Sequence, residues 1–204
     1  MKYAIVCGSH RKDSNSAKVA SYLKKAIESK ASSHNVYTLD LGRADLPLWD
    51  ESIDKGDPDW KKILDPISAE VSASEAIIVI SPEYGGMASP AIKNFFILFR
   101  KWELAHKPGL LVGVSASRGG SYPIAELRMS SYKNTRICYI PEHIIVQNAG
   151  DLLNENISSE HSVQDTYLRK RIGYAIDVLS KYAEALHIVR ESSVIDRKSY
   201  PNGM

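Results

Sequence analysis

The stretch Ser81-Pro82-Glu83-Tyr84-Gly85-Gly86-Met87-Ala88-Ser89-Pro90 decides the fold, because it joins two apolar segments of different kinds. Before it, residues 76–80 (AIIVI) form a short branched run that is typical of a buried strand. After it, residues 91–102 have the apolar density of a buried helix, with Ser89 placed as N-cap and Pro90 as first helical residue. The sequence therefore predicts a strand, a shaped turn and a helix, with backbone N–H groups exposed where the strand ends.

The rest of the chain repeats this alternation of strand and helix. Helical patterns separate five strand-like runs, at 3–7, 34–41, 76–80, 110–114 and 136–146, the last with a break at Pro141-Glu142-His143. Such alternation predicts an α/β fold with a parallel sheet that carries helices on both faces. We expect the strand order 2-1-3-4-5, which places strands 1 and 3 side by side at a switch point. Ligands bind at such points, beyond the carboxyl ends of the strands.

Composition excludes several classes of protein. The 204 residues carry a net charge of only +2, too little for a nucleic-acid partner. No run approaches the roughly 20 apolar residues of a membrane span, and the N-terminal run is too short for a signal peptide. Cys7 and Cys138 match no metal or redox spacing, so we expect buried thiols in a reducing compartment. We predict a cytoplasmic protein with one domain over residues 1–190 and a mobile polar tail over 191–204.

The turn after the first strand has the residues of an anion site. It contains neither G-x-G-x-x-G nor a Walker loop, but it offers the hydroxyls of Ser9, Ser14 and Ser16, the amide of Asn15 and the cation of Arg11. A helix follows, and the N–H groups and dipole at its start favour an anion. Several neutral donors with one cation suit a terminal phosphate monoester. The alternative is a plain capped helix, with Ser14 as N-cap and Arg11 solvated.

Four motifs in order give the chain a resemblance to a known family. They are Gly8-Ser9-x-Arg11-x-x-Ser14-Asn15-Ser16, Pro82-Glu83-Tyr84-Gly85-Gly86, the Lys93-Asn94 pair, and Gly119-Gly120 ahead of Leu127-Arg128. From residue 1 to about residue 150 the chain resembles the NADPH-dependent FMN reductase family, which includes quinone, azo-dye and chromate reductases. The resemblance implies a flavodoxin-like three-layer sandwich and a non-covalently bound FMN. NADPH or NADH would be the co-substrate.

The resemblance also implies where FMN would lie. The phosphate would contact Ser9, Arg11, Ser14, Asn15 and Ser16. The ring would lie along Pro82, Glu83, Tyr84, Gly85 and Gly86, with Ser117, Arg118, Gly119 and Gly120 at its pyrimidine edge or on the substrate side. Many members have Asn after the Tyr, where this chain has Gly85. Tyr84 could stack on the ring or donate a hydrogen bond, or it could only pack at the turn. Glu83 is expected to be a structural or solvent-facing carboxylate.

The implied reaction passes a hydride from the nicotinamide to flavin N5 and then electrons to a small acceptor. That acceptor could be a quinone, an azo compound, a metal oxyanion or free flavin. No catalytic side chain is expected, because the cofactor carries the chemistry. No metal is expected either, since the six histidines show no metal-ligand spacing.

Three other functions are weighed against this one. A flavodoxin-type electron carrier would usually be acidic, unlike this chain. A flavin-free scaffold would not need both ligand-like turns. A hydrolase is disfavoured because residues 113–117 (GVSAS) lack the last glycine of a nucleophile elbow.

The segment 95–99 (FFILF) is apolar around more than one helical face. A helix of this kind is buried on more than one side. We therefore predict a homodimer or homotetramer. The alternative is that the loop around Trp49 covers the second side.

Overall fold

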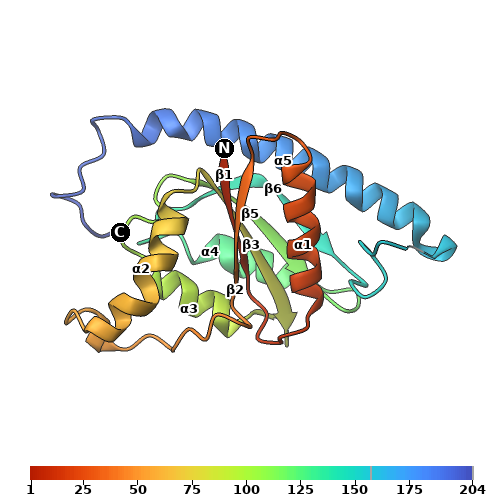
Figure 1. Cartoon of the computed structure of the whole chain (residues 1–204), viewed down its shortest axis with the longest axis horizontal. Helices are drawn as coiled ribbons and strands as arrows, with labels where there is room; N and C mark the ends of the chain where they lie inside the picture. The colour runs from red at the N-terminus through yellow and green to blue at the C-terminus, as the bar shows by residue number, and fades with distance from the viewer. Residues whose placement is uncertain (157, 204) are drawn as a thin grey trace.

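The computed structural model describes residues 1–156 and 158–203 (Figure 1). In chain order its elements are β1 (Lys2–Cys7), α1 (Asn15–Glu28), β2 (Asn35–Asp40), η1 (Glu51–Ile53), α2 (Pro58–Ser72), β3 (Ala76–Tyr84), β4 (Met87–Ala88), α3 (Pro90–Leu98), β5 (Pro108–Val114), α4 (Ser121–Met129), β6 (Cys138–Val146), η2 (Ser159–His161) and α5 (Ser162–Arg190).

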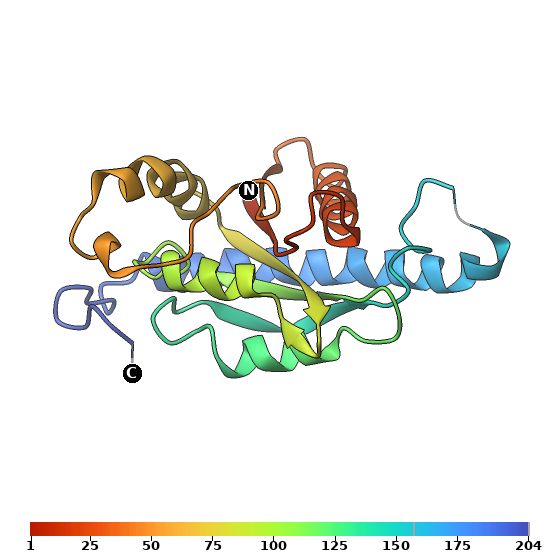
Figure 2. The ribbon, with the colours of Figure 1, turned by 90° about the horizontal axis from the view of Figure 1, so that it is seen from below.

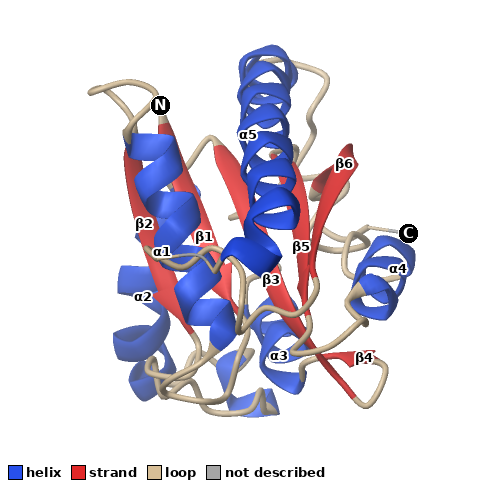
Figure 3. Cartoon of the chain, turned by 90° about the vertical axis from the view of Figure 1, so that its right-hand side faces the viewer, coloured by secondary structure: helices blue, strands red, loops and turns tan. Residues whose placement is uncertain are grey.

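The sheet has the order β2-β1-β3-β5-β6, and all of these strands are parallel. Counting only the parallel strands, this is the predicted order 2-1-3-4-5, which is confirmed. The short strand β4 was not predicted; it pairs antiparallel with the end of β3. Figure 3 shows this β3–β4 hairpin projecting beyond the end of the sheet.

Helices cover both faces of the sheet, as alternation along the strands requires. On β1, Tyr3 and Ile5 pack in the cluster that includes α1 and α5. Ala4 and Val6 point the other way, toward the cluster that includes α2, α3 and α4. Figure 2 shows α5 as one long helix that lies behind the strands and extends beyond them at both ends. The result is the predicted three-layer sandwich, whose core lies on both sides of the central strands β1 and β3, which are buried except at the start of β1 and the end of β3.

Two sequence-based boundaries were wrong. The helix predicted over 91–102 ends at Leu98, because Phe99 leaves the helical conformation and Trp102 has a φ of 78°. The predicted break at Pro141-Glu142-His143 is absent, because β6 continues through it with a register shift against β5. Strand β6 is the edge strand, where a proline costs no ladder hydrogen bond if its nitrogen faces outward.

The polar segment after α5 folds back against the domain. The Arg136 guanidinium donates to the Tyr200 carbonyl oxygen at 2.8 Å, and the Gly203 N–H donates to Asn134 Oδ1 at 3.2 Å. The mobility of this tail and the domain limits stay predictions, and residue 204 lies outside the described residues. Across the described part of the chain, no helix combines the length and apolarity needed to cross a membrane.

The two cysteines differ in burial. Cys7 is fully buried, as expected, whereas Cys138 is only partly buried at the start of β6. Burial raises the pKa of the Cys7 thiol to about 11, so it is protonated near neutral pH. Both cysteines are free thiols.

Candidate functional site

The end of β1 is bound to the start of α3. The Ser89 hydroxyl donates to the Gly8 carbonyl oxygen at 2.6 Å and accepts the Ile92 N–H at 3.3 Å, which makes it the N-cap of α3. Gly8 is required here, because a Cβ atom on it would lie 2.1 Å from the Ile92 side chain. The N-cap predicted at Ser89 is confirmed, and it also holds the turns after β1 and β3 together.

A hollow of about 500 Å³ lies at the carboxyl ends of β1, β3 and β5. We call it the switch-point hollow. It is lined by Ser9, Arg11, Asp13, Ser14, Asn15, Ser16, Lys18, Pro82, Glu83, Tyr84, Val114 and Ala116. Two turns that are about 70 residues apart in the chain therefore share one cavity. All five predicted phosphate residues line it, and so do the first three of the predicted ring turn.

The phosphate side of this hollow is built at the start of α1. Ser14 Oγ accepts the Ala17 N–H at 3.0 Å and is the N-cap, as the alternative interpretation expects. Ser9 and Ser16 are buried, with 1% and 2% of their surface exposed. The guanidinium of Arg11 is exposed and has no ion-pair partner within the described residues. A cap alone needs neither the two buried hydroxyls nor the unpaired cation.

One carboxylate also lines the phosphate side. Asp13 would repel an anion, but its Oδ1 atom accepts a hydrogen bond from the Arg43 guanidinium at 3.1 Å. Arg43 also pairs with Asp40 at the end of β2, at 3.4 Å. This neighbouring cation reduces the repulsion, although both partners of the Asp13 pair are exposed and solvent screens them.

Tyr84 links the two turns. Its hydroxyl and Ser9 Oγ share a hydrogen bond of 3.0 Å, and the Arg11 N–H donates to the same Ser9 oxygen at 3.1 Å. The Tyr84 ring lies 6.1 Å from the His10 ring, in a tilted arrangement. The phenol is thus a polar contact between the turns as well as a packing aromatic.

The predicted ring turn is a tight β-hairpin. Tyr84 pairs with Met87 across the two-residue loop Gly85-Gly86, whose φ angles are 58° and 74°. Positive φ at both loop positions is the type I′ geometry, which glycine adopts without strain. A Cβ atom on Gly85 would lie 3.8 Å from the Met87 side chain, and one on Gly86 would have nothing within 4 Å. Two glycines between strand-like residues are a hairpin signal, so sequence reasoning could have found β4.

Glu83 holds the turn at residues 117–120. Its Oε2 atom accepts the Gly120 N–H at 2.6 Å, and a Cβ atom on Gly119 would lie 2.6 Å from Oε1. A Cβ on Gly113 would lie 2.0 Å from the Gly120 carbonyl oxygen, so these backbones are in close contact. The glycine pair therefore packs behind the ring turn. Glu83 has the structural role expected of it.

Six of the predicted residues do not line the switch-point hollow: Gly85, Gly86, Ser117, Arg118, Gly119 and Gly120. Gly85 and Gly86 form the exposed tip of the hairpin, and Ser117 and Arg118 lie on an exposed loop. The Asn148 N–H donates to the Ser117 carbonyl oxygen at 2.8 Å, so this loop is tied to the segment after β6.

Glu126 supports the hairpin and was missed by sequence reasoning. It accepts the Ala88 N–H at 2.7 Å and the Lys93 ammonium at 2.5 Å. Partial burial acts to raise its pKa, but the hydrogen bonds from Lys93 and Ala88 and the charge of Lys93 outweigh it, so the pKa is lowered. No local pattern marks Glu126, because its partners lie more than 30 residues earlier in the chain.

Asn94, the other half of the Lys93-Asn94 pair, holds a loop. Its Oδ1 atom accepts the Trp49 N–H at 2.9 Å, and its Nδ2 atom donates to the Pro47 carbonyl oxygen at 2.8 Å. The loop around Trp49 therefore covers part of α3, as the alternative to an oligomer expects. Phe95, Phe96 and Phe99 are buried within the chain, whereas Ile97 is 44% exposed.

Four further lining residues were not predicted: Asp13, Lys18, Val114 and Ala116. Lys18 lies one turn after Ser14, so helical spacing could have revealed it. Its ammonium donates to Asn154 Oδ1 at 2.7 Å and to the Gly150 carbonyl oxygen at 3.2 Å. Val114 and Ala116 follow from the position of β5 next to β3, which the predicted strand order implies.

Comparison with known proteins decides the family. The sequence model described as NADPH-dependent FMN reductase matches residues 1–151. This chain belongs to that family. It is an NAD(P)H-dependent enzyme of the FMN reductase or quinone reductase type, and the family uses FMN with NAD(P)H. The expected resemblance is confirmed over the residues that carry the motifs.

Curated relatives support this family assignment. An NADPH azoreductase of Bacillus sp. (strain OY1-2) is 25% identical over 146 residues, which cover 72% of this chain and 76% of that protein. A quinone reductase of Pseudomonas putida is 31% identical over 125 residues, which cover 58% of this chain and 62% of that enzyme.

Solved structures show the fold. The NAD(P)H:(acceptor) oxidoreductase FerB of Paracoccus denitrificans has a TM-score of 0.70 at 22% identity, over 90% of this chain and 97% of its own. A flavodoxin from the domain Archaea has a TM-score of 0.52 at 17% identity, over 89% of this chain and 99% of its own. The flavodoxin-like fold is therefore confirmed.

Proposed function

We propose that this protein is an FMN-dependent NAD(P)H oxidoreductase that holds FMN in the switch-point hollow. One observation carries the proposal: the polar turn at Ser9–Ser16 and the turn that begins at Pro82 line one hollow at the point where strand order reverses. Ligands of doubly wound sheets bind at this point. Membership of the family supplies the cofactor class.

The residues of the hollow fit a flavin mononucleotide. Buried hydroxyls at Ser9 and Ser16, the start of α1 and the unpaired Arg11 offer neutral donors and one cation to a phosphate. The volume of about 500 Å³ lies within the usual range of cofactor sites. Pro82, Glu83 and Tyr84 form the wall along which the ring would lie, with Gly85 and Gly86 at its end and the Ser117–Gly120 turn beyond.

The roles of the chain's own residues are binding and orientation. Bound FMN would supply the redox chemistry, taking a hydride from NADPH or NADH and passing electrons to an acceptor. Tyr84 and Ser9 would keep the phosphate turn and the ring turn at a set distance through their hydrogen bond. Glu83 and Glu126 would hold the hairpin rigid, so that its backbone N–H groups are pre-organised.

For the acceptor, we propose a small molecule of the quinone or azo class. The two curated relatives, named as a quinone reductase and an azoreductase, support this choice. Metal oxyanions and free flavin are further members of the acceptor panel to be tested. A cytoplasmic location stays a prediction.

The test is a visible spectrum followed by stopped-flow mixing. We expect the protein to take up one FMN and the bound flavin to bleach on mixing with NADPH or NADH, then to reoxidise with a quinone or azo dye. No uptake of FMN would reject the flavin proposal. Uptake without bleaching by either nicotinamide would reject the reductase and favour an electron carrier.

We also propose that the protein is a homodimer or larger. A second hollow, of about 630 Å³, lies between α3 and α4 and has Ile97, Met129 and Tyr132 among its lining residues. These three side chains are more than 40% exposed, which is unusual for apolar groups gathered at one place. Light scattering that shows only a 22.7 kDa monomer would reject this proposal.

A further inference from the structure

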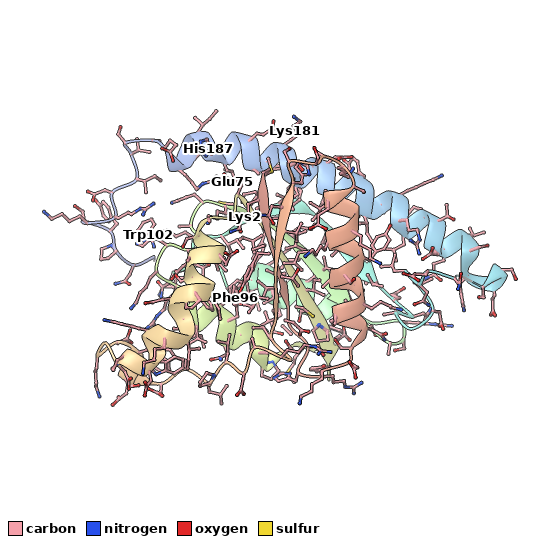
Figure 4. All side chains as sticks on the ribbon, in the orientation of Figure 1. Lys2, Glu75, Phe96, Trp102, Lys181 and His187 are labelled. Atoms are coloured by element: carbon pink, nitrogen blue, oxygen red, sulfur yellow. The ribbon has the colours of Figure 1, made fainter. Side chains whose placement is uncertain are left out.

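A third hollow lies at the opposite end of the sheet from the switch point. We call it the amino-end hollow, because Glu75 and Lys107 in its wall directly precede β3 and β5. Its volume is about 340 Å³. Figure 4 shows two of its residues, Glu75 and His187, together near the end of α5, with Trp102 to their left.

Lys107 is the unusual residue of this hollow. Its side chain is buried, with only 5% of the residue exposed, and its ammonium donates to the carbonyl oxygens of Val71 and Ser72 at 2.8 and 2.7 Å. A lysine ammonium has three N–H donors, so one remains. Within the described residues, no carboxylate forms an ion pair with it. Buried cations are normally paired, so this wall of the hollow lacks a counter-charge.

The other charged residues of the hollow are mostly cationic. Lys101, Arg190 and Arg197 join Lys107, against the carboxylates of Glu75 and Glu191. Glu75 is already paired with both Arg190 and His187. Counting only the lysine, arginine and glutamate side chains, the lining carries an excess of two positive charges.

The pKa values of Lys107 and His106 are both lowered, in part by nearby arginine charges. Burial, and then the charge of Arg190, lower the pKa of Lys107 to about 8, against the opposing effect of Glu75 and Glu103. Burial, followed by the charges of Arg136, Arg197 and Arg190, also lowers the pKa of the adjacent His106. A bound anion would oppose the part of both shifts that comes from the arginine charges.

The polar tail contributes one wall. The Arg197 guanidinium lies 5.0 Å from the centre of the Trp102 ring, and Arg136 lies 4.0 Å from the same ring. Trp102 owes its position to the left-handed φ of 78° that follows the end of α3. Arg197 can therefore reach an anion in the hollow only if the tail stays folded against the domain.

We propose that the amino-end hollow binds a phosphate group, free or carried by a small molecule, through Lys107, Arg190, Lys101 and Arg197. Cations in a cavity of this size suit a phosphate, which accepts several charge-assisted hydrogen bonds at once. Binding also fastens the tail, because Arg197 comes from it. This site is separate from the switch-point hollow and does not rest on the proposed function.

The test is calorimetric titration of the FMN-loaded protein with inorganic phosphate and with pyrophosphate, at constant ionic strength. We expect one saturable site that Arg197→Ala and Lys101→Ala each weaken about tenfold. The matched control is Lys198→Ala, which removes the neighbouring charge of the tail but does not line the hollow; its affinity should equal that of the parent. If both ligands bind, pyrophosphate binding more tightly than phosphate would indicate a diphosphate ligand.

Two further variants test the role of Lys107 and distinguish this site from the switch-point hollow. Lys107→Met should abolish binding; if this variant is unstable, the exposed Arg197→Ala still decides. Arg11→Ala, in the switch-point hollow, should leave the phosphate affinity of the FMN-loaded protein unchanged, because FMN would then occupy that hollow; a changed affinity would show that the titrated phosphate binds there instead. Equal affinities in Arg197→Ala and Lys198→Ala, or no saturable binding, would overturn the proposal.

A second readout follows the tail itself. Trypsin can cut after Arg197 and Lys198, and phosphate should slow this cleavage several-fold in the parent protein but not in Lys101→Ala. Cleavage that phosphate slows equally in both proteins would show that the anion does not act through this hollow.

Discussion

The two ends of the sheet offer different groups to the anions proposed to bind there. At the carboxyl end, the switch-point hollow offers buried serine hydroxyls, a helix start and two cations, the exposed Arg11 and Lys18, whose ammonium donates to Gly150 and Asn154. At the amino end, the hollow offers Lys107, Arg190, Lys101 and Arg197 and no helix start. The first set comes from a turn that is continuous in sequence, whereas the second is collected from two segments, 101–107 and 190–197, that lie far apart in the chain. Local turn chemistry can be read from a sequence, but a cluster of separate cations cannot.

The largest expected effect tests the close backbone contact behind the carboxyl-end hollow. Gly113→Ala would place a Cβ atom 2.0 Å from the Gly120 carbonyl oxygen, so we expect a loss of about 3 kcal/mol in unfolding free energy. Denaturant titration measures it. The control is Gly173→Ala inside α5, where nothing lies within 4 Å and a gain of about 0.5–1 kcal/mol is expected. Similar values for the two variants would contradict the contact.

The next largest effect tests whether Arg11 binds the FMN phosphate in the switch-point hollow. Arg11→Ala should weaken FMN binding by about 1.5–3 kcal/mol, because a charged hydrogen bond to the phosphate is lost. Lys12→Ala is the control, since Lys12 is equally exposed and does not line the hollow. Fluorescence titration with FMN measures both. An Arg11→Ala affinity equal to that of the parent would place the phosphate elsewhere.

A smaller effect tests whether position 85 in the hairpin requires glycine because of its positive φ. Gly85→Ala should cost about 1–2 kcal/mol of stability, because φ is 58° at this position. Gly85→Asn should cost less, because asparagine tolerates positive φ in such loops. Thermal unfolding of the two variants without FMN gives the comparison. Equal stability of Ala and Asn variants would mean that φ is not what requires glycine here.

The smallest expected effect is a pH slope from the amino end. The folded protein holds the pKa of Lys107 at about 8, below the value of about 10.4 expected in the unfolded chain. The unfolded state therefore binds more protons, and stability rises as pH increases through 8 toward 10. Between pH 7 and 8 the gain is a few tenths of a kcal/mol. Lys107→Met should lose this slope, and phosphate should flatten it in the parent; an unchanged slope in the variant would contradict the assignment.

Much of the fold could be predicted from the sequence because its signals are local. Apolar runs such as 76–80 and the N-cap Ser89 mark a strand and a helix start, and the strand order matches one of the common arrangements of doubly wound sheets. The missed strand β4 was also marked locally, by Gly85-Gly86. The end of α3 was not marked in the local sequence, because Phe99 remains apolar and buried after the helix has ended.

In the candidate site too, most of the residues marked by local sequence were predicted and those placed by tertiary contacts were missed. Its phosphate turn is continuous in sequence, and all five residues predicted for it line the hollow, although the binding of FMN there stays a prediction. Asp13 was absent from that prediction, and its partner Arg43 lies 30 residues away. Glu126 was missed because it reaches the hairpin only after α4 has packed against β4.

By itself, the sequence determined the alternation of strands and helices and the polar turn at Ser9–Ser16. These depend on side-chain periodicity and on hydrogen bonds between near neighbours. Only the tertiary structure decided that Glu83 and Glu126 hold the hairpin, and that Lys107 is buried without a carboxylate beside Arg190 and Arg197. Such pairings depend on which segments the packed core brings together, and no local pattern records that.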